Sequence, residues 1–257
     1  MARKRIVFLC GGGDSSRIIL AALETLGADI TTVLEQRPSP WLAFRKRVKR
    51  LGPKVALGQL MFRLLAVPCL RVATRRRIRE IRDRLPIPTP AQFAANYRVS
   101  SANGEDTRNL LADIDPDLVV LNGTRILSGE TLDTISAPIV NMHAGIAPAY
   151  RGVHGGYWAL VDGRPDLFGT TVHRVDRGVD TGEVLGRAFA SPTPRDTFVS
   201  YPYLQLQAGL PVLLRVVRDA LDRREGEPVP DLGLDSHQRF HPTLGRYIRT
   251  RWRQGVK

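Results

Sequence analysis

The first 36 residues constrain the fold most, because an apolar run, a glycine loop, a helical pattern and a second apolar run follow one another. The run RIVFLC (5–10) ends in GGGDSS (11–16). In RIILAALETLG (17–27) apolar residues recur at helical spacing, and Gly27 is a helix stop signal. The β-branched stretch ADITTVLEQ (28–36) predicts a second strand. This order predicts a βαβ unit and therefore a parallel sheet with helices packed against it.

The rest of the chain continues this alternation of strands and helices. Strands are expected at DLVVLNG (117–123), PIVNMHAG (138–145), FGTTVHRVD (168–176) and GEVLGRAFAS (182–191), with helices at 107–116, 128–136, 154–163 and 197–224. We expect one α/β domain with a Rossmann-like, mostly parallel sheet over residues 1–230. A short, irregular and basic tail is expected over residues 231–257.

Residues 37–90 interrupt the α/β pattern, and we interpret them as a helical insertion that ends at PIPTPA (86–91). Between Arg37 and Arg84 there are 15 Lys or Arg and two Asp or Glu, so this segment carries the net charge of +13 of the whole chain. A local excess of this kind predicts an anionic partner for the segment rather than a nucleic-acid-binding protein as a whole. Basic flanks around apolar stripes fit an anionic membrane surface. The alternative is a helical excursion that packs on the domain or on a second subunit.

Two cysteines, Cys10 and Cys69, are too few for a disulfide scaffold and favour a reducing cytoplasm. The basic and then apolar N-terminus is better interpreted as a first strand than as a signal peptide. The glycine loop with Glu35 partly matches a dinucleotide fingerprint, but Ser16 occupies the third glycine position. No G-x-S-x-G motif is present, and His143, His154 and His173 lack zinc-ligand spacing, so no metal is expected.

Polar side chains suited to acyl chemistry stand where three of the predicted strands end. Asn141 and His143 close one strand, His173 lies in another, and Asp180 follows in RGVDTGEVL. Loops at the carboxyl ends of parallel strands form a crevice in which ligands bind. An amide and an imidazole can each donate to an oxygen that becomes negative, and a carboxylate can take a proton from an attacking amine.

The motifs that contain these residues resemble those of the folate-dependent formyltransferases. The resemblance runs through PDLVVLNGTRILSGETL, VNMHAGIAPAYRGVHGGYWALVDG and GTTVHRVDRGVDTGEVL, and more weakly into PYLQLQAGLPVLLRVV. It covers about two thirds of the chain and omits the basic insertion. The ordered set Asn–x–His, P-x-Y-R-G and His–x6–Asp with D-T-G carries it.

The resemblance implies roles for particular residues, with 10-formyltetrahydrofolate as donor and no metal. Asn141, His143 and Asp180 match the catalytic trio of the family, and His173 matches a histidine that supports the Asp loop. Cofactor contacts are implied for Arg125, Ile126, Leu127, Gly178 and Val179. Substrate contacts are implied for Gly12, Gly13, Tyr150, Arg151 and Gly152.

Departures from the family pattern bear on the acceptor. Asp14 stands where glycinamide ribonucleotide enzymes have a Ser beside the substrate phosphate, and Leu206 replaces an acidic residue of their late helix. The tail leaves no room for the further domain of the tRNA enzymes. We therefore expect a primary amine of an amino sugar, nucleotide- or lipid-linked, as acceptor. A purine-pathway enzyme and a non-catalytic scaffold that binds membrane or RNA stay open, as does a homodimer.

Overall fold

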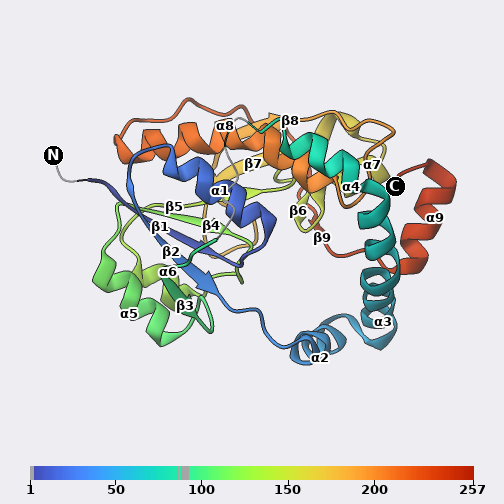
Figure 1. Cartoon of the computed structure of the whole chain (residues 1–257), viewed down its shortest axis with the longest axis horizontal. Coiled ribbons are helices and arrows are strands. Elements are labelled where there is room, and N and C mark those ends of the chain that lie inside the picture. The colour runs from blue at the N-terminus through green and yellow to red at the C-terminus, as the bar shows by residue number, and fades with distance from the viewer. Residues whose placement is uncertain (1–2, 86, 88–92) are drawn as a thin grey trace.

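The computed structural model describes residues 3–85, 87 and 93–257. Within them, seven strands form one sheet in the order β3–β2–β1–β4–β5–β7–β8 (Figure 1). Strands β3 to β5 are parallel, and β7 and β8 pair antiparallel at one edge. The mostly parallel sheet is therefore confirmed. The strands are β1 Arg5–Cys10, β2 Asp29–Glu35, β3 Tyr97–Val99, β4 Leu118–Asn122, β5 Ile139–His143, β7 Gly169–Arg174 and β8 Val184–Phe189.

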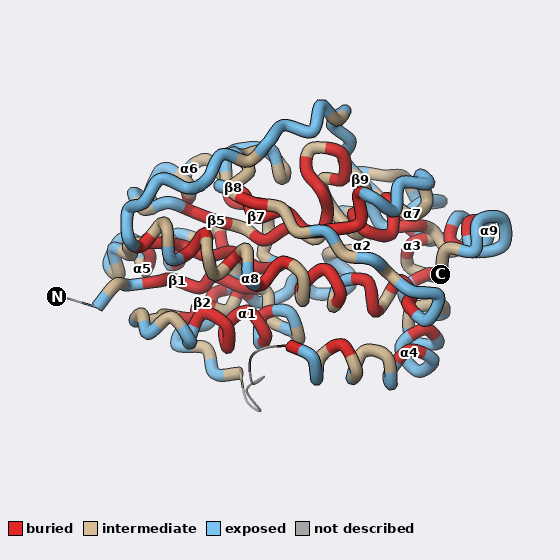
Figure 2. The backbone as a smooth tube through the Cα atoms, turned by 90° about the horizontal axis from the view of Figure 1, so that it is seen from above, coloured by how far each residue is buried: buried red, intermediate tan, exposed pale blue. Residues whose placement is uncertain are grey.

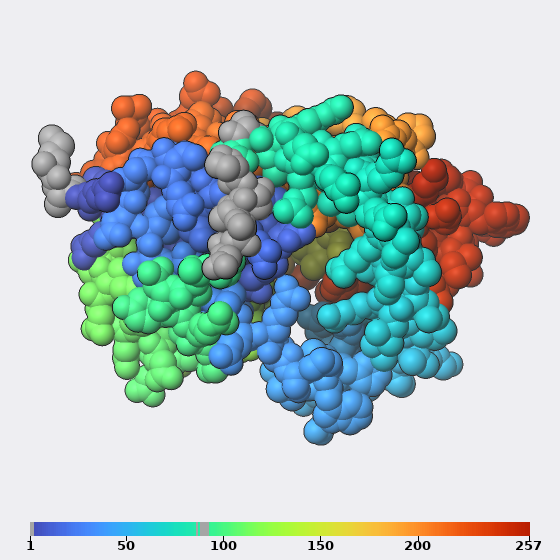
Figure 3. Space-filling view, in the orientation of Figure 1, coloured from blue at the N-terminus to red at the C-terminus, as the bar shows by residue number. Residues whose placement is uncertain are grey.

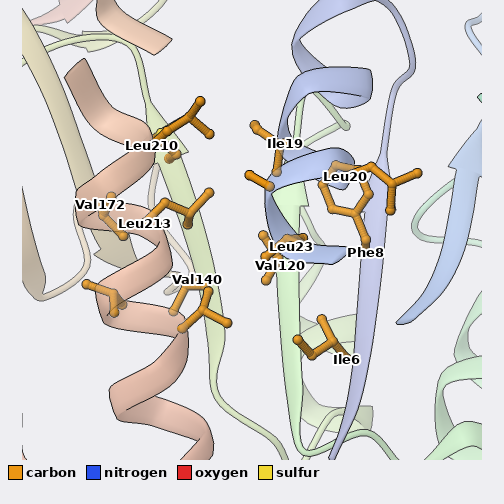
Figure 4. Close-up of a cluster of buried hydrophobic side chains, with 14 of the residues drawn as sticks. Ile6, Phe8, Ile19, Leu20, Leu23, Val120, Val140, Val172, Leu210 and Leu213 are labelled. Carbon is orange, nitrogen blue, oxygen red and sulfur yellow. The ribbon is translucent and has the colours of Figure 1, made fainter. Parts of the chain in front are cut away.

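Helices cover both faces of the sheet, as parallel strands require. They are α1 Asp14–Glu24, α5 Glu105–Ile114, α6 Gly129–Thr134, α7 Gly155–Val161 and α8 Tyr201–Leu221. Alternate residues of β1 serve the two faces. Ile6 and Phe8 pack with α1 and α8 (Figure 4), whereas Val7 and Leu9 pack with the side chains of α5 and α6. This strand is therefore buried on both sides and positions the glycine loop at its carboxyl end.

The region between β2 and β3 is helical, as expected. It contains α2 Pro40–Leu51, α3 Pro53–Met61, a π-helical turn η1 Phe62–Ala66 and α4 Val67–Arg82. In Figure 3 this segment lies along one side of the molecule, beside a hollow that separates it from the N-terminal strands and helix. The expected Pro-rich end of the insertion, PIPTPA, lies outside the described residues except for residue 87. The short strand β3 was not predicted, because three residues at a sheet edge give almost no periodic signal.

A third apolar cluster attaches the helical segment to the domain. Phe62, Leu70 and Ile81 are buried there together with aromatic residues of α7, α8 and the tail. Arg77 donates from Nε and Nη2 to the two oxygens of Asp196 at 2.8 and 3.1 Å, and the Asp196 side chain is fully buried. Burial raises the pKa of Asp196, but the Arg77 hydrogen bonds outweigh it and lower that pKa. The segment is therefore fixed to the body along one side.

The tail is irregular only in part, so the expectation of a wholly irregular tail is wrong. It forms a two-residue strand β9 (Gln238–Arg239), which pairs with β6 (Arg151–Gly152), and an 11-residue helix α9 (Leu244–Gln254). Thr243 caps α9 by accepting from the Arg246 amide at 3.2 Å. Tyr247 is buried 4.9 Å from the Phe62 ring. Because this contact joins positions far apart in the chain, the local pattern gave no sign of it.

Candidate active site

Asn141 and His143 lie two positions apart on β5, so their side chains share one face of the sheet. Strand β7 pairs antiparallel with β5 and places His173 directly opposite Asn141. The Asn141 Nδ2 atom lies 3.2 Å from the His173 Nε2 atom. Two strands that are about 30 residues apart in the chain therefore bring an amide and an imidazole together.

Asp180 reaches the same place from the loop between β7 and β8. Its backbone has a positive φ of 51°, and its Oδ2 accepts from the Gly152 amide at 2.8 Å. Its Oδ2 lies 3.3 Å from Nδ1 of His143, and its Oδ1 lies 3.4 Å from Nε2 of His173. All four predicted strand-end residues thus converge at one point.

The hydrogen bonds of His143 determine its tautomer. The Nε2 atom lies 2.6 Å from the Tyr150 carbonyl oxygen, which can only accept, so Nε2 carries the hydrogen. In the neutral ring Nδ1 then presents a lone pair toward Asp180. Burial lowers the pKa of His143, against the Asp180 charge and the Tyr150 carbonyl, which raise it. The neutral form is therefore favoured, and a lone pair and a carboxylate face each other.

His173 is fixed in the same way. Its Nδ1 lies 2.8 Å from the Arg174 carbonyl oxygen and donates to it. In the neutral ring Nε2 is therefore an acceptor for one hydrogen of the Asn141 amide. This bond orients Asn141 and leaves its second N–H hydrogen available.

Asp180 is held as a carboxylate. Burial alone raises the pKa of Asp180, but the neighbouring His173 and His143 rings and the hydrogen bond from the Gly152 amide outweigh burial and lower it. A buried carboxylate with these neighbours stays ionised at neutral pH and can accept a hydrogen bond or a proton.

These residues line a cavity of about 410 Å³ at the carboxyl ends of β4 and β5. Its apolar wall includes Leu121 and Val175. Every residue for which a cofactor contact was predicted lines it as well: Arg125, Ile126, Leu127, Gly178 and Val179. A Cβ at Gly178 would overlap the Thr181 hydroxyl, which donates to Asp176, so a larger residue there would displace that hydroxyl. The loop that carries Asp180 is thus closed tightly on itself.

Arg125 lines the cavity, and both its amide and its guanidinium have partners within the protein. Its amide donates to Glu35 Oε2 at 2.8 Å, and its side chain reaches the carbonyl oxygens of Gln36 and Ser100. Glu35 is buried and also accepts from the Ala102 amide. Glu35, which partly matched a dinucleotide fingerprint in the sequence, therefore fixes a loop of the cavity wall.

The residues predicted to bind substrate divide between several places. Gly152 lines the cavity, whereas Tyr150 is a core residue whose carbonyl meets His143. Arg151 donates to the Val179 carbonyl at 3.0 Å and lines a separate surface hollow. Gly12 and Gly13 line a second cavity of about 780 Å³, between the glycine loop and the helical segment.

Several cavity residues were missed by the sequence analysis. Arg47, Arg50 and Gln59 of the helical segment line the first cavity, as do residues 238–241 of the tail. Arg47, Gln59 and His241 line both cavities, so the two are neighbours. The concentration of charge in residues 37–84 was the available signal, but it did not show that the segment folds back over the site.

Histidines outside the strand-end set have structural partners. His154 lies 2.8 Å from His241 through ring nitrogens, and His237 belongs to the segment that reaches β6. Within residues 3–85, 87 and 93–257, no group of three His, Cys, Asp or Glu side chains is arranged to hold a metal ion.

The Rossmann-like sheet and the amide, imidazole and carboxylate at its carboxyl end define an α/β protein equipped for acyl-type group transfer. A family model described as formyl transferase matches residues 68–216, from the start of α4 to within α8. The chain belongs to this formyl transferase family.

Curated relatives match only parts of the chain. A GDP-perosamine N-formyltransferase of Brucella melitensis is 28% identical over 158 residues, which are 61% of this chain and 60% of the relative. A methionyl-tRNA formyltransferase of Desulfotalea psychrophila is 38% identical over 88 residues, 34% of this chain and 27% of the relative. The chain thus spans at most about 60% of the length of these relatives.

Solved structures share the fold at low identity. A sugar N-formyltransferase from a Shewanella species superposes with a TM-score of 0.56 and 11% identity, covering 91% of this chain and 76% of that one. Glycinamide ribonucleotide transformylase 1 of Symbiobacterium toebii also gives 0.56, with 19% identity and coverage of 86% and 89%. These likenesses establish the formyltransferase fold.

Proposed function

We propose that this protein transfers a formyl group from 10-formyltetrahydrofolate to a primary amine of an amino sugar. The observation that carries the proposal is the convergence of Asn141, His143 and Asp180 on one cavity. That cavity lies within the 300–1,000 Å³ typical of small-molecule sites. Among the relatives, the GDP-perosamine N-formyltransferase and the sugar N-formyltransferase support the amino-sugar acceptor.

The first cavity fits a folate. Leu121, Leu127 and Val175 provide apolar surface for a flat ring system, and residues 123–126 border it. Arg47 and Arg50 stand at the same cavity and suit the carboxylates of a glutamyl tail. When bound, the folate supplies a carbon at the formyl level, which is the electrophile for the amine.

We assign Asn141 as the donor to the formyl oxygen as that oxygen becomes negative. His173 holds one N–H hydrogen of the amide, and the second is free to donate. Both ring nitrogens of His143 already face partners, so His143 reaches the oxygen only by releasing one of them. This differs from the sequence-based expectation that His143 also donates directly.

Asp180 and His143 form the proton acceptor in this proposal. Attack by a neutral amine creates an ammonium that must lose a proton. Asp180 accepts that proton directly or through water, and the lone pair on Nδ1 of His143, 3.3 Å from Oδ2, shares it. The proton then returns to the folate nitrogen that leaves, so charge and atoms balance without a covalent enzyme intermediate.

We place the acceptor in the second cavity. The glycine loop lies on one wall, and Arg37, Arg47, Arg63, Arg71 and Arg75 are among the lining residues. Such a wall suits the phosphate groups of a nucleotide-linked or lipid-linked sugar. Asp14 also lines it, but Asp14 accepts from the Tyr203 hydroxyl at 2.6 Å and lies 3.6 Å from Arg82. Its expected repulsion of phosphate is therefore partly offset.

Four further expectations from the sequence remain predictions. The boundaries 1–230 and 231–257, the cytoplasmic location, the homodimer and the contact of residues 37–84 with an anionic membrane stay predictions. A glycinamide ribonucleotide acceptor is the second candidate, because the fold is shared with such an enzyme.

A panel of amines with 10-formyltetrahydrofolate tests the proposal. Aminosugar nucleotides, lipid-linked amino sugars and glycinamide ribonucleotide are each incubated with donor, and tetrahydrofolate release and formyl-amine mass are followed. We expect turnover with an amino sugar, and Asn141→Ala should lower kcat by about 10²–10³ with little change in folate affinity. Folate binding by the wild type without transfer to any amine would support the scaffold alternative. Absence of folate binding would remove the proposal.

A further inference from the structure

Helices α3 and α4 join through η1 into one helical stretch, Pro53–Arg82, whose apolar surface is mostly uncovered. The stretch is 30 residues long and apolar enough to cross a membrane by length and composition. Only 22% of its most apolar 18-residue window is buried. A core helix of the same composition would be buried over most of that window, so the exposed surface needs another explanation.

One side of the stretch is attached to the domain and excludes a spanning role. Phe62, Leu70 and Ile81 are buried in the third apolar cluster. Gln59 donates to the His241 carbonyl at 2.7 Å, and Thr74 shares a hydrogen bond with Thr197. A helix held along this length by the protein body can lie on a membrane but cannot pass through it.

The opposite side carries an apolar stripe. Its members lie three, four or seven residues apart, except for the adjacent Leu64 and Leu65, and therefore share one helical face. Leu64 and Val72 are 62% and 69% exposed. Figure 2 shows exposed positions along this helical segment. The sequence between Val55 and Leu70 contains one charged residue, Arg63, which lines the second cavity instead. The stripe consists of Leu57, Met61, Leu64, Leu65 and Val72.

Basic residues flank the stripe at both ends. Lys54 precedes it, and the exposed Arg75, Arg76 and Arg79 follow it on α4. Within the described part of the chain, Arg75, Arg76 and Arg79 form no ion pair. These cations therefore have no carboxylate to neutralise them and remain available to an external anion.

Helix α9 extends this surface. It lies beside α3 in both views (Figures 1 and 2), and it contacts both α3 and η1. A Cβ at Gly58 of α3 would meet the Thr243 side chain at the start of α9. Residues 244–257 contain five Lys or Arg and no Asp or Glu. Ile248 and Trp252 are exposed, Trp252 by 80%. A second amphipathic helix thus stands next to the first.

The combination of apolar and basic side chains on this surface indicates which kind of partner binds it. A second copy in a symmetric dimer would bring the same excess of positive charge against itself, which is repulsive. A nucleic acid would satisfy the cations but would leave aliphatic side chains in water. An anionic bilayer satisfies both, because acyl chains accept leucine and tryptophan while headgroups pair with arginine.

We propose that the apolar stripe of α3–α4, together with α9, docks this protein on an anionic lipid bilayer as an interfacial, non-spanning surface. Docking does not depend on the proposed formyl transfer. It gives the basic residues of this segment an anionic partner, the lipid headgroups.

Flotation of the full chain with phosphatidylglycerol-containing vesicles and with pure phosphatidylcholine vesicles tests this proposal. The wild type should float with the anionic vesicles and lose binding at high salt. The triple variant L64Q/L65Q/V72Q should bind at least about 100-fold more weakly. The variant R76Q/R79Q should bind the anionic vesicles more weakly, by about fivefold for each cation removed. The matched controls F189Q and R218Q/R223Q, which alter exposed residues away from α3, α4 and α9, should float as the wild type does.

Circular dichroism of each variant and flotation of Asp180→Asn complete the design. Asp180→Asn should float normally, which separates docking from catalysis. Wild-type protein that stays unbound, or a folded triple variant that floats as well as wild type, overturns the proposal. A dimer in light scattering that the triple variant abolishes would assign the stripe to a second copy instead. Salt-sensitive RNA binding without flotation would assign the charge to nucleic acid.

Discussion

The carboxyl end of the sheet, where we propose catalysis, and the helical segment Pro40–Arg82 differ in how their charged groups are paired. At the sheet, Asp180 has three partners within 3.4 Å, and the ring nitrogens of His143 and His173 each face a named atom. In the segment, Arg47, Arg50 and Arg63 form no ion pair within the described residues. Partial burial and then the charges of Arg63 and Arg50 lower the pKa of Arg47. The charged groups at the sheet are paired within the protein, whereas these three arginines of the segment are left for an external anion, unlike Arg77, which pairs with Asp196.

This difference separates two tasks. Groups that move a proton must be held in fixed geometry, and sheet register with short loops provides that. Groups that attract an anionic ligand can stay unpaired until the ligand arrives. We therefore expect substitutions at the sheet to change turnover, and substitutions in the segment to change binding or stability.

The largest expected effect is that of Asp180→Asn, which keeps the shape of the side chain but removes its charge. The proposed proton acceptor is lost, so kcat should fall by about 10²–10⁴. Asp133→Asn, at a surface ion pair with Arg177, is the control and should leave kcat unchanged. Tetrahydrofolate release measures both. Equal turnover of Asp180→Asn and wild type would show that Asp180 is not the proton acceptor.

Phe62→Ala tests how firmly the segment is attached. Phe62 is buried against Phe198 and Tyr247, with ring centroids 4.9 Å apart in each pair, so its loss should cost about 3–5 kcal/mol of unfolding free energy. Leu64→Ala, two residues along on the exposed side, should cost less than about 0.5 kcal/mol. Urea denaturation compares them. Similar costs for the two would mean that the segment is not packed as described.

The double variant Arg47→Gln/Arg50→Gln tests the unpaired cations. We expect the KM for an anionic substrate to rise by about tenfold with little change in kcat, because binding is lost equally in ground and transition states. Separate titration of folate and acceptor shows which of them loses affinity. Arg98→Gln, on the edge strand β3, is the charge control. A fall in kcat at constant KM would contradict the division of tasks.

The smallest expected effect is the pH dependence of stability. The pKa of His143 is lowered on folding, so the unfolded chain takes up a proton first as the pH falls below about 6.5, and stability declines. The decline has a limit of about 1.4 kcal/mol per pH unit from this group. The pKa of Asp180 is also lowered, so its contribution is present above about pH 4 and is lost only as pH falls through its folded value.

Urea denaturation of wild type and His143→Gln at pH 7.5 and 5.5 measures this. The variant should lose less stability on acidification than the wild type does. His237→Gln, in an exposed part of the tail, is the control. Equal declines in wild type and His143→Gln would show that His143 is not held neutral.

Much of the catalytic end was predictable from the sequence, because local patterns mark strand ends. Asn141 and His143 follow an apolar run, and a sheet of mostly parallel strands gathers such ends at one edge. His173 was expected to support the Asp180 loop, and it also contacts Asn141, which only the antiparallel register of β5 and β7 shows. The orientation of His143 depends on the Tyr150 carbonyl, which no residue type encodes.

The sequence by itself determined the βαβ start, the helical nature of the insertion and the set of strand-end residues, because spacings of two and 3.6 residues are local properties of the backbone. The tertiary structure alone decided that Arg47, Arg50, Gln59 and residues 238–241 border the same cavity. It also formed α9 from a stretch that was expected to be irregular. Contacts between residues some 180 positions apart, such as Gln59 with His241, depend on how helices pack across the whole domain, and no local pattern encodes that.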